Sequence, residues 1–237
     1  MDAHDVRPVG VTASFHAPGH GPALRGAGAI ADNGRVTAEH YFSAEPAAPA
    51  RRGQVEFSVG GRDYALTAAS GVFSAGRLDP GTAVLLRKGD LPTAATTGTL
   101  LDLGCGYGPI ACVLASEAPG ATVYAVDVNN RARDLTAENA ATLGLTIRVA
   151  APDDVPAEVT FDEIWSNPPT HVGKAELHAV LQRWLPRLAP DGVAWLVINK
   201  HLGGDSLHAW LVGLGWQVTR IASQKGFRVL RVARKTD

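Results

Sequence analysis

The chain carries one glycine-rich segment, Leu101-Asp102-Leu103-Gly104-Cys105-Gly106-Tyr107-Gly108. Because an apolar run leads into it, Asp102 is expected at the end of a strand and the three alternate glycines in a turn to a helix. Glycine tolerates positive φ and lets a ligand approach the bare backbone. In a parallel α/β sheet, ligands bind beyond the carboxyl ends of the strands. The segment therefore predicts a ligand site at that edge of a sheet.

The glycine spacing differs from that of dinucleotide-binding loops. Their fingerprint is G-x-G-x-x-G, with the pyrophosphate on the helix N-terminus. Here the pattern is G-x-G-x-G, and Asp102 precedes it. A carboxylate suits positively charged groups of a ligand better than it suits a pyrophosphate. Taken alone, the glycines are also explained by a tight structural turn.

Short apolar runs alternate with helical patterns around this loop. The expected strands are Leu100–Leu103, Thr122–Val126, Thr146–Val149, Glu163–Trp165 and Val193–Ile198. The expected helices are Pro109–Glu117, Arg131–Leu143 and Ala175–Leu188. Two last runs, Trp216–Ile221 and Phe227–Val232, flank the turn Lys225-Gly226 and predict an antiparallel hairpin. The predicted fold class is α/β, with a mostly parallel seven-stranded sheet and helices on both faces.

Asp127 ends the second expected strand, Thr122–Val126. A carboxylate at the carboxyl end of that strand can accept both hydroxyls of a ribose. The same residue could instead cap the helix that follows, and the two roles are compatible. Together with the glycine loop, Asp127 favours a nucleoside ligand.

The fourth expected strand runs into Ser166-Asn167-Pro168-Pro169-Thr170-His171. An NH2 group attached to a π system is a poor nucleophile because its lone pair is delocalised. The Asn167 side-chain oxygen and the Pro168 carbonyl can accept its two N–H bonds, which would aim the lone pair at an electrophile. Two prolines fix φ and donate no competing N–H. The motif favours a planar NH2 group as the reacting group.

The part of the chain before the glycine loop is expected to be less regular. Residues 1–37 lack an apolar period and predict a flexible extension. In residues 38–95, Gln54–Val59 and Asp63–Thr67 surround Gly60-Gly61 and predict a hairpin. Asp79-Pro80 looks like the N-cap and first residue of a helix through Leu86. The main domain is then expected over residues 96–237.

Composition excludes several classes of protein. The formal charge of −1 argues against a strongly basic nucleic-acid binder, although a local patch such as the Lys- and Arg-rich tail from Gln217 could still contact phosphate. Eight His and two Cys show no metal-ligand spacing, so no metal is expected. The first residues lack the pattern of a signal peptide, and no apolar run is long enough to span a membrane. The two cysteines are expected to be free thiols, which fits a reducing compartment. A cytoplasmic protein is therefore expected.

With these motifs, the sequence resembles the class I S-adenosylmethionine-dependent methyltransferases, and within them the "methyltransferase small" group. That group includes small-subunit ribosomal RNA guanine-N2 methyltransferases. The resemblance runs from about Glu39 to the C-terminus. Beyond the loop and Asn-Pro-Pro, it includes His40-Tyr41-Phe42-Ser43, Gly71-Val72-Phe73-Ser74, Asp127-Val128-Asn129, Val172-Gly173-Lys174 and Lys225-Gly226-Phe227.

The resemblance implies a Rossmann-like fold, S-adenosylmethionine as cofactor and ribosomal RNA or a ribosomal subunit as partner. The cofactor-binding residues it implies, together with the motifs above, are Asp102, Gly104, Cys105, Gly106, Gly108, Asp127, Val128, Asp153 and Asn167. The catalytic residues are Asn167, Pro168 and Pro169. Candidate substrate contacts are Phe73, Ser74, Thr170, His171, Lys200 and Phe227.

Two departures from the family pattern stand out. Many amino-methyltransferases carry an aromatic residue after Asn-Pro-Pro, which stacks on a flipped base, whereas this chain has Thr170. Phe73 or Phe227 is then the candidate for stacking. The acid expected to bind adenine after the third strand corresponds to Asp153 or Asp154, which follow Pro152.

Several alternatives stay open at this point. Asn-Pro-Pro does not separate a guanine N2 amine from an adenine N6, a protein glutamine amide or a small-molecule amine, because all are planar NH2 groups. A cofactor-binding RNA-interaction module without catalysis is a second alternative. An NAD-dependent oxidoreductase is a third, disfavoured by the glycine spacing.

Overall fold

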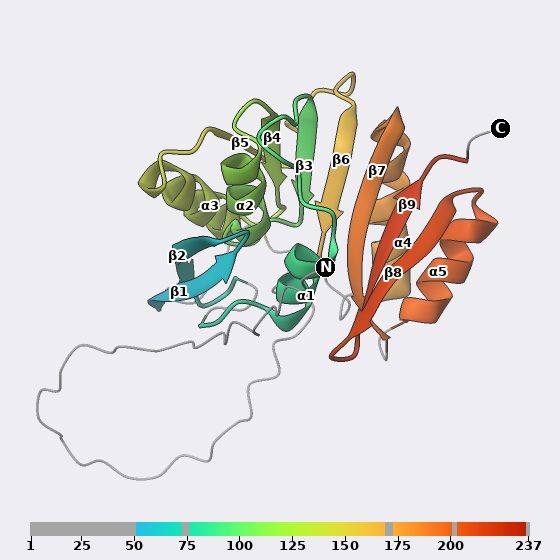
Figure 1. Cartoon of the computed structure of the whole chain (residues 1–237), viewed down its shortest axis with the longest axis horizontal. Coiled ribbons are helices and arrows are strands. Elements are labelled where there is room, and N and C mark those ends of the chain that lie inside the picture. Colours follow the sequence, from blue (N-terminus) through green and yellow to red (C-terminus); the bar gives the residue numbers. More distant parts are fainter. Residues whose placement is uncertain (1–50, 73–75, 169–172, 201–202, 236–237) are drawn as a thin grey trace, which may run out of the picture.

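The computed structural model describes residues 51–72, 76–168, 173–200 and 203–235 (Figure 1). The predicted extension over residues 1–37 and the expected start of ordered structure near Glu39 lie outside these ranges. The same holds for five predicted site residues, which are Phe73, Ser74, Pro169, Thr170 and His171.

The main sheet has seven strands in the order β5-β4-β3-β6-β7-β9-β8. Their bounds are β3 (Thr99–Leu103), β4 (Thr122–Val126), β5 (Ile147–Ala150), β6 (Phe161–Ser166), β7 (Leu188–Asn199), β8 (Gln217–Gln224) and β9 (Phe227–Ala233). Strands β5, β4, β3, β6 and β7 run parallel, and β9 lies antiparallel between β7 and β8. This confirms the predicted mostly parallel sheet with a C-terminal antiparallel hairpin. Since β3 has β4 on one side and β6 on the other, the strand order reverses at β3, where α/β sheets bind ligands.

Helices cover both faces of the sheet, as Figure 1 shows. They are α1 (Pro80–Lys88), α2 (Pro109–Glu117), α3 (Asn130–Thr142), α4 (Lys174–Trp184) and α5 (Gly204–Gly213). Successive strand residues point to opposite faces. Leu100 on β3 therefore joins the core under α1, α2 and α3, whereas Leu101 joins the core under α4 and α5.

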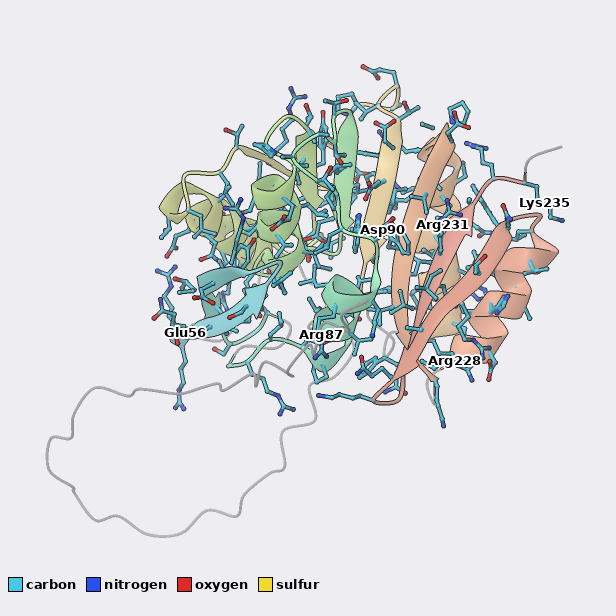
Figure 2. All side chains as sticks on the ribbon, viewed as in Figure 1. Glu56, Arg87, Asp90, Arg228, Arg231 and Lys235 are labelled. Carbon is cyan, nitrogen blue, oxygen red and sulfur yellow. The ribbon has the colours of Figure 1, made fainter. Side chains whose placement is uncertain are left out.

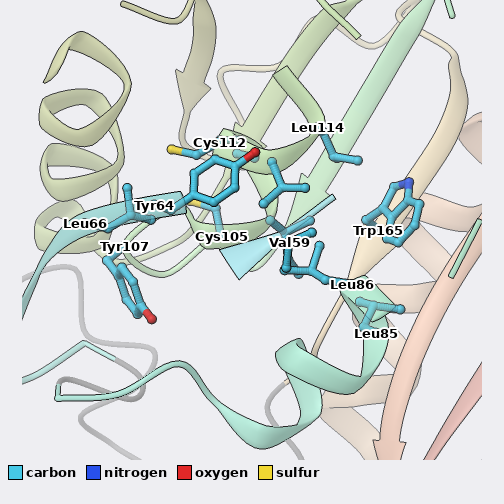
Figure 3. Packing of buried hydrophobic residues seen from close by; sticks show 14 of the residues in the cluster. Val59, Tyr64, Leu66, Leu85, Leu86, Cys105, Tyr107, Cys112, Leu114 and Trp165 are labelled. Carbon is cyan, nitrogen blue, oxygen red and sulfur yellow. The ribbon is translucent and has the colours of Figure 1, made fainter. Parts of the chain in front are cut away.

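A separate hairpin of β1 (Arg52–Val59) and β2 (Arg62–Ala69) packs over α2 and α3. Figure 3 shows its side chains beside those of α1 and α2, with Val59, Tyr64, Leu66, Leu85, Leu86, Cys112 and Leu114 in one buried cluster. The Asn139 amide on α3 binds the backbone of Thr67 on both sides, accepting its N–H at 2.8 Å and donating to its carbonyl at 2.9 Å. It also donates to the Tyr107 carbonyl at 2.8 Å. Asn139 thus links the hairpin to the glycine loop.

Helix α1 begins as predicted. Asp79 is its N-cap and accepts the Thr82 N–H at 2.9 Å, and Pro80 is its first residue. Glycines bring this helix close to the sheet: a Cβ at Gly81 would lie 3.0 Å from the Phe227 ring, and one at Gly89 would lie 2.6 Å from Trp165. The N-terminus of α1 is therefore held against the start of β9.

Two elements differ from the sequence expectation. The helix expected through Leu188 ends at Trp184, and residues Leu185–Arg187 form a 3-10 turn around Pro186. Proline has no N–H to continue an α-helix, and β7 can therefore begin at Leu188, before the expected Val193. Helix α5 was not expected at all. It begins at Gly204 behind Gly203, which caps it without a side-chain hydrogen bond, so the usual start signal is missing.

Candidate active site

The glycine loop lies at the carboxyl end of β3, as predicted. The Gly104 N–H donates to the Val126 carbonyl at 2.8 Å, which ties the loop to the end of β4. Gly104, Gly106 and Gly108 have φ of 79°, 59° and 88°, a region that favours glycine. At Gly108 a Cβ would also lie 2.9 Å from the Thr136 side chain. The turn therefore requires glycine for its backbone angles and, at Gly108, for space.

Asp127 stands at the end of β4 and faces the loop. One carboxylate oxygen accepts the Gly106 N–H at 3.0 Å and the other accepts the Asn129 N–H at 2.9 Å. Burial raises the pKa of this carboxyl, and the backbone N–H donors and Arg133 oppose the shift. Each carboxylate oxygen has a second lone pair, so Asp127 can still accept hydroxyl groups of a ligand.

A cavity of about 460 Å³ opens between the ends of β3, β4 and β6. Its size is within the range of about 300–1,000 Å³ that is usual for small-molecule sites. Gly104, Asp127, Val128, Pro152 and Pro168 contribute to its wall. The cavity thus combines apolar surface with the Asp127 carboxylate, an acceptor suited to the hydroxyls of a nucleoside.

Asp102 lies deeper than the sequence suggested. It is fully buried, it lines neither this cavity nor the smaller one described below, and one of its oxygens accepts the Ala111 N–H of α2 at 2.9 Å. The other oxygen, Oδ1, has no hydrogen-bond partner among the described residues. Burial raises the pKa of this carboxyl to about 8. Asp102 therefore supports the loop from below.

Asp153 sits at the rim of the large cavity with a largely exposed side chain. Its carboxylate pairs with Arg183 of α4 at 2.7 Å, and Arg183 also donates to the Pro152 carbonyl at 2.6 Å. On the opposite wall Arg133 donates to the Asp127 and Val128 carbonyls at 2.7 and 3.0 Å. Arg133 and Arg183 were not identified from the sequence, because neither belongs to a motif.

Asn167 follows β6 and lies next to α1. Its Nδ2 donates to Asp79 Oδ1 at 2.6 Å and contacts Thr82 Oγ1 at 3.0 Å. A carboxylate only accepts hydrogen bonds, so the atom that faces Asp79 must be the nitrogen of the Asn167 amide. The Asn167 oxygen is left to accept from another group.

A second, narrow cavity of about 20 Å³ lies at this point. It is lined by Asp79, Thr82, Asn167 and the loop from Gly104 to Tyr107, so Gly104 belongs to the walls of both cavities. The Tyr107 hydroxyl in its wall is buried and has no hydrogen-bond partner among the residues that the structure describes. Burial, with the charge of Asp79, raises its pKa. From the sequence, Asp79 was predicted only as a helix cap, and no functional role was predicted for Thr82 or Tyr107.

The remaining predicted residues fall at the same edge of the sheet. Cys105 is a buried free thiol within the loop. Lys200 is exposed at the end of β7, with its N–H bonded to the Gly226 carbonyl at 2.8 Å. Phe227 begins β9 and packs against α1 at Gly81. In the described ranges no cluster of three or more His, Cys, Asp or Glu side chains is placed to hold a metal ion. No helix of these ranges has the length and apolarity that a membrane span requires.

Comparison with known proteins gives the family. A family model described as the methyltransferase small domain matches residues 63–231. The chain belongs to this family. The protein is therefore an S-adenosylmethionine-dependent methyltransferase, and this confirms the predicted enzyme class and cofactor.

Proteins similar to this chain differ in length. The uncharacterized protein YbxB of Bacillus subtilis (strain 168) is 34% identical over 197 residues, which are 81% of this chain and 97% of that protein. Ribosomal RNA small subunit methyltransferase C of Aeromonas hydrophila is 39% identical over 141 residues, 59% of this chain and 40% of that protein. Its namesake in Shewanella baltica (strain OS195) is 35% identical over 182 residues, 72% of this chain and 51% of that protein.

Among solved structures, the 16S rRNA N2 methyltransferase RsmC of T. thermophilus, in complex with AdoMet and guanosine, matches with a TM-score of 0.66 and 27% identity. The match covers 79% of this chain and 52% of that one. The chain thus spans about half, or less, of the length of these ribosomal RNA methyltransferases, whereas it spans nearly all of YbxB.

Proposed function

We propose that the protein methylates the exocyclic N2 amine of a guanine in small-subunit ribosomal RNA, with S-adenosylmethionine as methyl donor. The observation that carries the proposal is the orientation of Asn167. Its amide nitrogen is held by Asp79, so its oxygen is free to accept an N–H from an incoming amine.

The lining of the large cavity supports this assignment of the cofactor. The large cavity, with Asp127 and Val128 in its wall, is assigned to the adenosine part, and the loop from Gly104 to Gly106 to the methionine part. Asp127 is positioned to accept ribose hydroxyls. The bound cofactor supplies an electrophilic methyl group on a positively charged sulfur. The narrow cavity beside Asn167 is then where acceptor and methyl group meet.

Asn167 and Pro168 are assigned to the acceptor amine. The Asn167 oxygen and the Pro168 carbonyl accept its two N–H bonds and leave the lone pair facing the methyl group. As the new C–N bond forms, the nitrogen becomes more positive and both N–H bonds become better donors. These two contacts therefore strengthen toward the transition state, which is how such contacts raise kcat.

Two observations support RNA as the acceptor. Relatives at 34–41% identity carry names of ribosomal RNA small subunit methyltransferases, and the similar T. thermophilus structure holds guanosine. Basic side chains also gather at the active edge, where Lys174, Lys200 and Lys225 are exposed at the ends of three different elements. Figure 2 shows the exposed Arg87 at this same end of the molecule. Such side chains can contact the phosphates around a target base.

The test is a methylation assay with small subunits lacking N2-methylguanine, carried out with radiolabelled S-adenosylmethionine. Label in N2-methylguanosine after nuclease digestion is the expected result. Asn167→Ala is expected to lower kcat about a hundredfold or more, because the removed contact acts in the transition state. Its affinity for S-adenosylhomocysteine should stay within a factor of about two.

The other planar amines provide the contrary outcomes. Label in N6-methyladenosine, in a glutamine of a ribosomal protein or in a small molecule would support methylation of a planar amine and refute guanine N2 as the acceptor. Absence of label from every fraction, with S-adenosylhomocysteine still bound, would refute all of these acceptors.

A further inference from the structure

Asp79 and Thr82 lie 88 and 85 residues before Asn167 in the chain, outside the seven-stranded sheet, yet both contact its amide. We infer that these two residues are positioning residues for methyl transfer: they hold the Asn167 amide so that its oxygen faces the acceptor. The inference rests on the proposed role of Asn167 and adds the residues through which α1 controls it.

Without these contacts the amide could turn over. The two ends of an asparagine amide have nearly the same shape, so sterics alone do not choose between them. A flipped Asn167 would present an NH2 group to the acceptor NH2, and two donors cannot bond. Asp79 Oδ1 at 2.6 Å and Thr82 Oγ1 at 3.0 Å both lie on the nitrogen side. Asp79 can only accept, so it selects the orientation that points Nδ2 toward it, and the Thr82 hydroxyl supports that orientation as a second acceptor.

Both positioning groups are themselves held in place. Asp79 Oδ1 also accepts the Thr82 N–H at 2.9 Å as the N-cap of α1. Thr82 is 4% exposed, so its hydroxyl has little freedom to move. The same helix turn is fixed from the other side, because the Phe227 ring packs on Gly81. The contact to Asn167 therefore involves rigid groups, which lose little conformational entropy when it forms.

Asp79 adds an electrostatic effect to this alignment. A carboxylate that accepts from Nδ2 polarises the amide and makes its oxygen a stronger acceptor, since linked hydrogen bonds reinforce one another. The acceptor nitrogen gains positive charge during transfer, so this reinforcement is largest in the transition state. Loss of Asp79 should therefore lower kcat more than it raises KM.

The first experiment compares Asp79→Ser with Asp79→Asn. Serine is as good an N-cap as aspartate, but its hydroxyl is shorter and should not reach Asn167. Asn keeps both the cap and an oxygen at the same distance, without the charge. We expect kcat to fall about thirtyfold in Asp79→Ser and about threefold in Asp79→Asn, with KM and S-adenosylhomocysteine affinity nearly unchanged.

The second pair tests the hydroxyl. Thr82→Val removes Oγ1 at constant shape and is expected to lower kcat about fivefold, and Thr82→Ser should restore most of it. Val84→Ala serves as the stability control. Val84 is fully buried on α1 and lines neither cavity. The Val84→Ala variant should lower Tm at least as much as the Asp79 and Thr82 variants do, while its kcat at 25 °C stays within a factor of about two of the wild-type value.

A measurement that does not depend on activity tests the positioning role independently of the proposed acceptor. The Asn167 side-chain NH2 resonance, identified by its loss in Asn167→Ala, should show slow hydrogen exchange in the wild type and fast exchange in Asp79→Ser. Fast exchange in the wild type, or a kcat in Asp79→Ser equal to that of Val84→Ala, would overturn the inference. Slow exchange in a protein that methylates no RNA would instead keep the positioning role and refute the proposed acceptor.

Discussion

The Asp102 carboxylate accepts the Ala111 N–H at 2.9 Å, and this bond joins the end of β3 to the first turn of α2 beneath the glycine loop. Burial is the largest cause that raises its pKa to about 8, the bond from Ala111 opposes the shift, and the charge of Asp127 adds to it. At neutral pH this carboxyl is therefore mostly protonated.

This shift predicts how stability depends on pH. The folded protein holds a proton on Asp102 that the unfolded chain releases near the ordinary pKa of 3.8. The stability contributed by the group is complete below pH 3.8 and is lost as pH rises to about 8. We expect Asp102 to lower the free energy of unfolding by up to about 1.4 kcal/mol per pH unit in this window.

Asp102→Asn should remove that part of the slope, because an amide does not titrate. Urea unfolding of both proteins at pH 5 and pH 8 measures the difference. Asp127 also has a raised pKa and contributes in the same direction in both proteins. Parallel stability curves for the two proteins would show that Asp102 does not hold the proton.

Asp127→Ala should weaken binding of S-adenosylhomocysteine about tenfold to a hundredfold, because hydrogen bonds to a charged group contribute about 1.5–3 kcal/mol. The change also removes the acceptor of the Gly106 N–H and loosens the loop. Asp134→Ala makes the same change of charge at an exposed position of α3 and should leave the affinity unchanged. Isothermal titration calorimetry compares them, and equal dissociation constants would remove Asp127 from the cofactor site.

Two glycine substitutions separate backbone strain from steric conflict. Gly108→Ala places a methyl group 2.9 Å from Thr136 at a φ of 88°, whereas Gly144→Ala has a φ of 66° and no atom within 4 Å. We expect Gly144→Ala to destabilise the fold by about 1 kcal/mol and Gly108→Ala by about 3 kcal/mol. Only Gly108→Ala should also weaken S-adenosylhomocysteine binding. If urea unfolding gives similar losses of unfolding free energy for the two variants, the loop must shift to accommodate the added methyl group.

Asn139→Ala tests the link between hairpin and loop. Its loss leaves the Thr67 N–H and the Thr67 and Tyr107 carbonyls without this partner, and we expect a destabilisation of about 2–4 kcal/mol. Hydrogen exchange at the Thr67 amide should accelerate more than exchange in β4. Thr142→Ala removes an exposed helix hydroxyl and should stay within about 0.5 kcal/mol. A uniform rise in exchange over both regions would indicate global loss of stability in place of a broken local link.

The sequence predicted the elements whose start and end signals are local. Pro109–Glu117 was predicted with its observed bounds, because the αL residue Gly108 and Pro109 mark the start of that helix. The cap Asp79 was predicted for the same reason. Asp127 and Asn167 were placed correctly at strand ends because parallel strands bring their carboxyl ends to one edge.

What the sequence could not predict depends on tertiary contacts. The pairing of Asn167 with Asp79 joins residues 88 positions apart, and no local pattern records it. The depth of Asp102 follows from the packing of α2 on β3, and helix α5 lacks a capping side chain at Gly203. These features come from how the elements meet, whereas motifs describe each element by itself.

The difference in size between the two cavities bears on which chemical group the protein can transfer. The space that borders both the glycine loop and Asn167 measures about 20 Å³, and the two glycines in its wall, Gly104 and Gly106, have no side chain that could rotate away. A one-carbon substituent on sulfur fits such a gap, whereas the allyl or propargyl groups of synthetic cofactor analogues exceed it. We therefore expect this gap to favour transfer of a one-carbon group, and alkyl labelling of the natural target should require enlarging the side wall formed by Ile110.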